Sequence, residues 1–123
     1  MQTSVETMTW WQDYFNCVDS LDMDKIADWF AVDIELQFAN TLIKGQKAAM
    51  EAIAGFTSQL SGMKHELGPV LEKDDEMFAD AVVNYRFQDG RVLNIPAGTY
   101  IKREGQKISD LRIYIDLSPV YAK

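Results

Sequence analysis

Apolar and polar residues alternate regularly in the second half of the chain, between Met63 and Asp116. Four runs rich in apolar and β-branched residues are separated by residues that favour turns. The predicted strands are Met63–Glu72, Met77–Phe87, Arg91–Arg103 and Lys107–Asp116. The connections are only three or four residues long, so neighbouring strands must run antiparallel in one sheet. Pro96 and Gly98 inside the third strand predict a bulge and a bend, and therefore a curved sheet with a concave face.

Three stretches of the first half place apolar residues three and four positions apart, which predicts helices. A capping box formed by Thr3 and Glu6 would begin the first helix. The residues expected on the buried face of this helix are Met8, Trp11, Phe15 and Val18, with Tyr14 beside them. The other two helices are expected over Met23–Ala31 and Gln46–Leu60, with Gly62 in the left-handed conformation that ends the last one.

Short strands are predicted between the second and third helices. Ile34, Leu36 and Phe38 alternate with polar residues, and Leu42–Lys44 can return beside them after a turn. The whole order predicts a single α+β domain over residues 1–123. In this domain a curved antiparallel β-sheet wraps around the N-terminal helices to form a cone with an internal pocket.

Charge and cysteine content limit the partners and the compartment. The chain has 12 basic and 19 acidic residues, a formal net charge of −7. Such a charge repels phosphate backbones and anionic lipids, so we expect neither nucleic acid nor membrane as a partner. The single cysteine, Cys17, cannot form an internal disulfide and fits a reducing compartment. No N-terminal run resembles a signal peptide and no stretch approaches a membrane span, so we expect a cytoplasmic protein.

Asp19 and His65 are the first candidates for chemistry. Asp19 is predicted in the last turn of a helix, where the helix dipole disfavours an anion. A solvated carboxylate that begins a turn is the simpler interpretation, and a partner elsewhere in the chain is the other. His65, the only histidine, shares the expected inner face of its strand with Met63 and Leu67. It can be a satisfied core residue, or it can transfer protons near neutral pH.

The order of elements resembles the nuclear-transport-factor-2-like, or cystatin-like, α+β cone over essentially the whole chain. The stretches that carry the resemblance are Tyr14–Asp22, Trp29–Asp33, Ile43–Gly45 and Ile108–Asp116. The pattern looks most like the SnoaL-like group of small cyclases, isomerases and dehydratases, relatives of ketosteroid isomerase, scytalone dehydratase and the polyketide cyclases. This resemblance implies a pocket for a small hydrophobic organic ligand and chemistry that needs no cofactor.

The resemblance can be followed residue by residue. Tyr14 matches the first-helix tyrosine with which ketosteroid isomerases donate to the substrate oxygen, but Phe38 stands where their catalytic base would be. Asp19 and His65 match an aspartate and a sheet histidine of scytalone dehydratase, whose second sheet histidine is replaced here by Phe87. The resemblance therefore implies a catalytic set of His65, Asp19 and Tyr14.

The chemistry of this set is coherent. A carboxylate that accepts from one imidazole nitrogen fixes the tautomer and raises the basicity of the other nitrogen. A phenol close to it can donate to a carbonyl oxygen that becomes enolate-like. We therefore expect a lyase, isomerase or cyclase that transfers a proton on a hydrophobic carbonyl compound. Metal catalysis is not expected, because one histidine and one cysteine give no suitable ligand cluster.

Further side chains are expected to bind the ligand, and two other functions remain open. The predicted ligand-binding residues are Trp29, Phe38, Phe56, Asn94 and Tyr100. The same pocket could instead sequester a hydrophobic ligand without catalysis, or the domain could serve only for association between chains. Arg112 and Tyr114 alternate with apolar residues on the last strand, so the outer sheet face is the expected contact of a homodimer.

Overall fold

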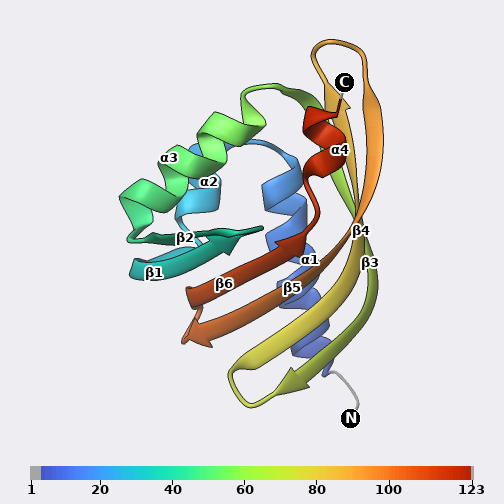
Figure 1. The fold of residues 1–123 in the computed structure, drawn as a ribbon. Coiled ribbons are helices and arrows are strands. Elements are labelled where there is room, and N and C mark those ends of the chain that lie inside the picture. The colour runs from blue at the N-terminus through green and yellow to red at the C-terminus, as the bar shows by residue number, and fades with distance from the viewer. Residues whose placement is uncertain (1–3, 123) are drawn as a thin grey trace.

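The sheet is the framework on which the other elements are placed (Figure 1). The computed structural model describes residues 4–122. Its strands are β1 (Phe30–Phe38), β2 (Thr41–Lys44), β3 (Leu60–Lys73), β4 (Glu76–Phe87), β5 (Val92–Glu104) and β6 (Lys107–Ile115). Its helices are α1 (Val5–Asp19), α2 (Met23–Ala27), α3 (Gln46–Thr57) and α4 (Ser118–Tyr121). The expected α+β class and the curved sheet beside N-terminal helices are confirmed.

The strands form one sheet in the order β2-β1-β6-β5-β4-β3. The long strands β3 to β6 make the predicted antiparallel meander, and β1 pairs antiparallel with β2. The contact between β1 and β6 is parallel, and it joins the two halves of the chain in one sheet. In Figure 1 the sheet curves around α1, which packs against β3, while α3 lies against β1 and β2.

The bulge predicted in the third strand of the meander is wrong. Pro96 and Gly98 lie in β5, which pairs with β4 in unbroken register. Gly98 instead makes room for the ring of Phe78, because a Cβ at this glycine would lie 2.7 Å from the ring. The register shifts in β3, where Gly68 and Pro69 together oppose one residue of β4. A proline is tolerated there because β3 is the edge strand and needs no donor on its open side.

Helix α1 differs from the prediction in its N-cap residue and in the residues that it buries. Ser4 is its N-cap, and its side chain accepts a hydrogen bond of 3.1 Å from the backbone N–H of Thr7. Thr3, the expected cap, lies outside the described residues. The buried residues of α1 are Thr7, Trp10, Trp11, Tyr14 and Phe15. Met8 is 41% exposed, because the buried stripe is centred on Trp11 and Tyr14 instead.

The second and third helices are shorter than their apolar periodicity suggests. α2 ends at Ala27, since Phe30 already pairs with Ile108 of β6. α3 ends at Thr57, and the predicted left-handed residue Gly62 lies in β3. In both places strand pairing across the sheet overrides a helical pattern that would otherwise continue. No helix in residues 4–122 is long and apolar enough to cross a membrane.

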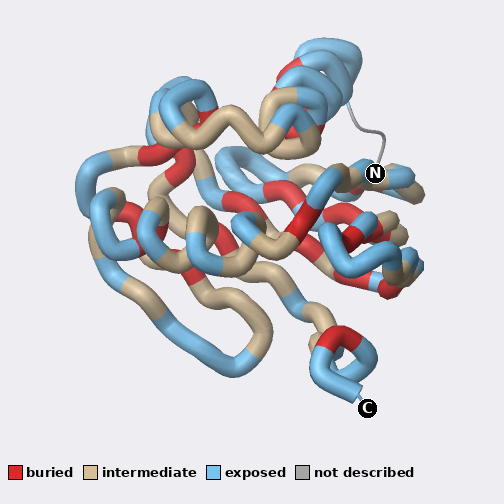
Figure 2. Tube along the Cα trace, turned by 90° about the horizontal axis from the view of Figure 1, so that it is seen from above, coloured by how far each residue is buried: buried red, intermediate tan, exposed pale blue. Residues whose placement is uncertain are grey.

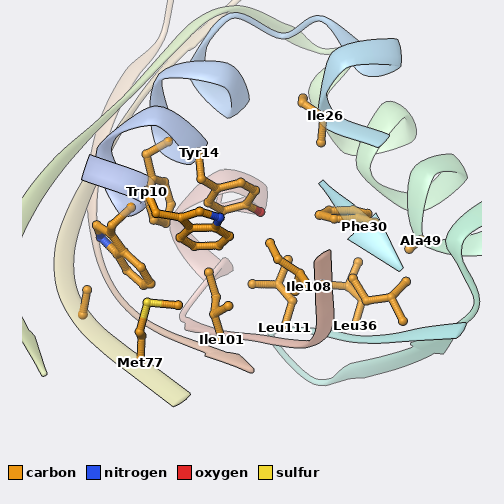
Figure 3. Close-up of a cluster of buried hydrophobic side chains, with 14 of the residues drawn as sticks. Trp10, Tyr14, Ile26, Phe30, Leu36, Ala49, Met77, Ile101, Ile108 and Leu111 are labelled. Carbon is orange, nitrogen blue, oxygen red and sulfur yellow. The ribbon is translucent and has the colours of Figure 1, made fainter. Parts of the chain in front are cut away.

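Buried and exposed residues alternate along the strands, and the core lies between the sheet and the helices (Figure 2). One cluster of buried side chains joins the aromatic face of α1 to β1, β4, β5 and β6. Figure 3 shows the rings of Trp10 and Tyr14 in this cluster, close to Met77 and Ile101 of the sheet. A second cluster gathers under α4, around Tyr85 and Phe87 of β4. The region where the two clusters meet contains the cavity described next.

Candidate functional site

Asp19, the last residue of α1, is hydrogen-bonded to His65 of β3 through both carboxylate oxygens. Oδ2 accepts the backbone N–H of His65 at 2.8 Å, and Oδ1 lies 2.6 Å from Nδ1 of the imidazole ring. The side chains are only 18% and 11% exposed, respectively. The predicted contact between Asp19 and His65 is therefore confirmed, and these bonds offset the unfavourable position of the carboxylate at a helix C-terminus.

This contact fixes the state of the imidazole ring. A carboxylate can only accept, so Nδ1 carries the proton in the neutral ring and Nε2 carries the lone pair. No described residue is hydrogen-bonded to Nε2. The ring of Phe15 packs against the imidazole with a centroid distance of 4.5 Å, which holds its plane. The side chain of His65 also lines the space described next.

That space is a cavity between the helices and the concave face of the sheet. Its volume is about 60 Å³, compared with about 10–15 Å³ for one water molecule. Helices α1, α2 and α3 and every strand except β2 contribute to its walls, and most lining side chains are apolar or aromatic. The polar members are Tyr14, Thr57, His65, Tyr85 and Thr99. None of the described lining residues is Lys, Arg, Asp or Glu, so the walls are uncharged apart from the histidine.

Two tyrosines, Tyr14 and Tyr85, line this cavity. Burial first, and the Cys17 thiol second, raise the pKa of Tyr14 well above its usual range. Burial first, and the negative charge of Asp19 second, do the same to the pKa of Tyr85. No described residue is hydrogen-bonded to either hydroxyl. Both phenols therefore stay protonated and remain free to donate.

The SnoaL-like domain family matches residues 11–111 of the chain. The chain belongs to this family.

Solved structures of similar shape agree with this assignment. A candidate SnoaL-like polyketide cyclase from Shewanella putrefaciens CN-32 is 10% identical, with a TM-score of 0.82 over 93% of this chain and 82% of that one. A hypothetical protein with a ketosteroid isomerase-like fold from Catenulispora acidiphila DSM 44928, in complex with trimethylamine, is 17% identical, with a TM-score of 0.80 over 98% and 92%. TerC, co-crystallised with polyporic acid, is 12% identical, with a TM-score of 0.77 over 93% and 94%. At these identities the likeness establishes the fold alone, and no curated protein sequence matches the chain.

Four of the residues predicted from the sequence line the cavity of this SnoaL-like domain: Tyr14, Phe38, Phe56 and His65. The rings of Phe38 and Phe56 meet edge to face with centroids 5.2 Å apart, which joins β1 to α3. Trp29 is not among the lining residues. Its ring contacts Tyr14 at a centroid distance of 5.6 Å and so supports the cavity wall from behind.

Asn94 and Tyr100 were predicted to bind ligand, and the structure places both of them away from the cavity. Alternation along β5 points Ile95 and Thr99 inward, so Asn94 and Tyr100 lie on the outer face of the sheet. Asn94 is hydrogen-bonded to the Asn84 side chain on that face. Tyr100 donates to a carboxylate on the neighbouring strand, at 2.5 Å. Their polar tips suggested ligand contacts, but the alternation along the strand assigns both residues to the outer face.

Tyr85 is the site residue that the sequence interpretation missed. It is buried on β4 together with Val83 and Phe87, with which it shares one face of the strand. Inward parity on a strand next to the one that carries His65 was the available signal. No group of three or more His, Cys, Asp or Glu side chains suited to a metal ion occurs in residues 4–122.

Proposed function

We propose that this SnoaL-like domain binds a small hydrophobic carbonyl compound in its cavity and transfers a proton on it without a cofactor. The activity is that of a lyase, isomerase or cyclase, with His65 as the general base. The observation that carries this proposal is the Asp19–His65 pair, which leaves Nε2 without a partner among the described residues of the cavity wall. The apolar lining fits a hydrophobic ligand and keeps the base away from bulk water.

The reaction follows from the orientation of these groups. Nε2 of His65 takes a proton from the carbon next to the carbonyl group, and the electron pair of the broken C–H bond forms a carbon–carbon double bond. The carbonyl π electrons move to the oxygen, which accepts a hydrogen bond from the Tyr14 phenol. Asp19 stabilises the imidazolium that results. The proton then returns to another carbon, or it leaves with a hydroxyl group as water.

Two structural relatives support a small-molecule role. TerC was co-crystallised with polyporic acid, and the Catenulispora acidiphila protein was solved with trimethylamine. Both proteins share the fold of this chain, so the fold can hold organic molecules of different size. A non-catalytic binding module is the second candidate function, because the same apolar walls would hold a ligand whether or not His65 reacts with it.

We also propose that the protein is a cytoplasmic homodimer, joined across the outer face of the sheet. That face exposes apolar and aromatic side chains on β3, β4 and β6, since Leu71, Phe78 and Tyr114 are 58%, 41% and 47% exposed. Arg112 lies among them and is paired with Asp110 at 3.0 Å. Large side chains of this kind are typical of surfaces that pair like chains.

Proton exchange on a simple ketone tests the proposed chemistry. Acetophenone is incubated with the protein in D₂O, and loss of its methyl proton signal is followed by NMR. His65→Ala and Asp19→Asn are expected to slow the protein-dependent exchange by about 10²–10⁴-fold, the usual effect of losing a general base. Glu66→Gln, an exposed change on the same strand, is the control and leaves the rate unchanged.

Binding is measured on the same variants to separate the two candidate functions. If acetophenone binds but the wild-type protein exchanges its protons no faster than the His65→Ala variant, the domain is a binding module and the catalytic proposal is wrong.

A further inference from the structure

Tyr85 lies on the same inward face of the sheet as His65, on the adjacent strand. In the β3–β4 register Tyr85 is opposite Met63, and Val83 is opposite His65. Tyr85 and His65 are therefore diagonal neighbours across the two strands, close enough for long side chains to reach the same bound molecule. Both side chains line the cavity.

The Tyr85 ring is held firmly while its hydroxyl is left free. The residue is 4% exposed. Its ring meets Phe56 edge to face at a centroid distance of 5.4 Å and lies 6.1 Å from the ring of Phe87. No described residue is hydrogen-bonded to its hydroxyl. Because this hydroxyl has no protein partner, a ligand oxygen that enters the apolar cavity can accept a hydrogen bond from it.

The charges around the cavity limit what that group can be. No Lys or Arg occurs among the described lining residues, so no cation is available to pair with an anionic ligand. The Asp19 carboxylate behind His65 further disfavours a negative charge in the same space. The rings of Phe15, Phe38 and Phe56 offer flat apolar surface. A neutral ligand with a flat frame fits these walls.

We propose that Tyr85 binds an oxygen atom of the ligand as a second hydrogen-bond donor beside Tyr14. The ligand class is then a neutral aromatic or otherwise flat compound that carries a carbonyl or hydroxyl oxygen. This inference rests on the proposed function, because it assigns Tyr85 to the same cavity. It adds a residue outside the predicted set and names the feature of the ligand that this residue recognises.

Two probes of similar shape test the role of the hydroxyl. Acetophenone carries a carbonyl oxygen, whereas ethylbenzene has the same ring without an oxygen. The ratio of their dissociation constants is measured by calorimetry for the wild-type protein and for Tyr85→Phe. The variant is expected to weaken acetophenone binding by about 3–10-fold, the net effect of one hydrogen bond, and to leave ethylbenzene binding unchanged.

Tyr100→Phe is the matched control, because the same substitution there removes a tyrosine hydroxyl on the outer face of the sheet, away from the cavity. This variant should leave both dissociation constants unchanged. Equal acetophenone binding by the wild-type protein and Tyr85→Phe overturns the inference while the proposed function stands. If neither probe binds the wild-type protein, the inference and the proposed binding function both fall.

A measurement on the unmutated protein makes the result independent of any folding defect. In protein labelled with ¹³C at the tyrosine ζ carbon, the Tyr85 resonance is identified by its loss in the variant. It should move when acetophenone is added and stay in place when ethylbenzene is added. An identical response to both probes means that the hydroxyl does not contact the oxygen, and the inference is then wrong.

Discussion

The carboxylate of Asp19 binds one residue twice, through the backbone N–H and the Nδ1 atom of His65, at 2.8 Å and 2.6 Å. The two residues are 46 positions apart in the chain. The first bond anchors the end of α1 to the edge strand β3, and the second sets the tautomer of the only histidine. The same carboxylate therefore both joins two elements and orients the imidazole, and experiments must measure these two effects separately.

The hydrogen bond at Nδ1 can be observed directly. A proton held between an imidazole and a carboxylate is shielded from water and resonates far downfield in the ¹H spectrum. We expect such a signal in the wild-type protein at low temperature and its loss in Asp19→Asn, because an amide is a much weaker acceptor. Asp33→Asn, an exposed change on β1, is the control and should keep the signal. A spectrum that is the same in Asp19→Asn would show that the two side chains are not coupled.

Glu72 makes the stability of the domain depend on pH in the acidic range. The Thr7 hydroxyl and the Ser4 backbone N–H donate to its carboxylate, and they hold the pKa of Glu72 below its usual range. A carboxyl group whose pKa is lower in the folded state stabilises the fold at any pH above its pKa in the unfolded state. This contribution is lost as the pH falls through its pKa in the folded state. We expect urea midpoints to decrease between about pH 5 and pH 3, and to decrease less in Glu72→Gln.

Glu66→Gln serves as the control for the acid experiment, since Glu66 is exposed on the same strand. Its pH profile should follow that of the wild-type protein. A Glu72→Gln profile that also follows the wild type would mean that the carboxylate does not stabilise the start of α1.

Two leucines of the β1–β2 hairpin should respond very differently to truncation. Leu36 is fully buried in the main core cluster, whereas Leu42 is 54% exposed. Leu36→Ala removes buried apolar surface and leaves a cavity, so the free energy of unfolding should fall by about 2–5 kcal/mol. Leu42→Ala should change it by less than about 0.5 kcal/mol. Similar losses in the two variants, measured by urea unfolding, would contradict the placement of the core.

The proposed dimer is tested on the outer face of the sheet. Tyr114 is 47% exposed and lies on the strand that carries Asp110 and Arg112. Tyr114→Glu adds a charge that would be buried between the chains, so we expect a monomer by light scattering at concentrations where the wild type is dimeric. Val5→Glu, at the exposed start of α1, should not change the mass. A monomeric wild-type protein at high concentration would rule out the dimer.

The sequence by itself determined the elements whose signal is local. Alternation with period two and short polar turns located the four long strands, and the alternation along the first of them assigned His65 to its inner face. Alternation along β5 was also sufficient to place Asn94 and Tyr100 on the outer face, whereas their polarity alone suggested ligand contacts. The position of Asp19 at the wrong end of a helix dipole indicated that a partner was needed.

Only the tertiary structure decided how these elements meet. The parallel pairing of β1 with β6 ends α2 early, and the register shift at Gly68 and Pro69 lies in β3 and not at Pro96. The contact between Asp19 and His65 and the diagonal placement of Tyr85 also depend on how the curved sheet packs and pairs. The physical reason is that side-chain periodicity records which face of an element is buried. It does not record which distant segment covers that face, because this is set by packing and hydrogen bonding across the whole sheet.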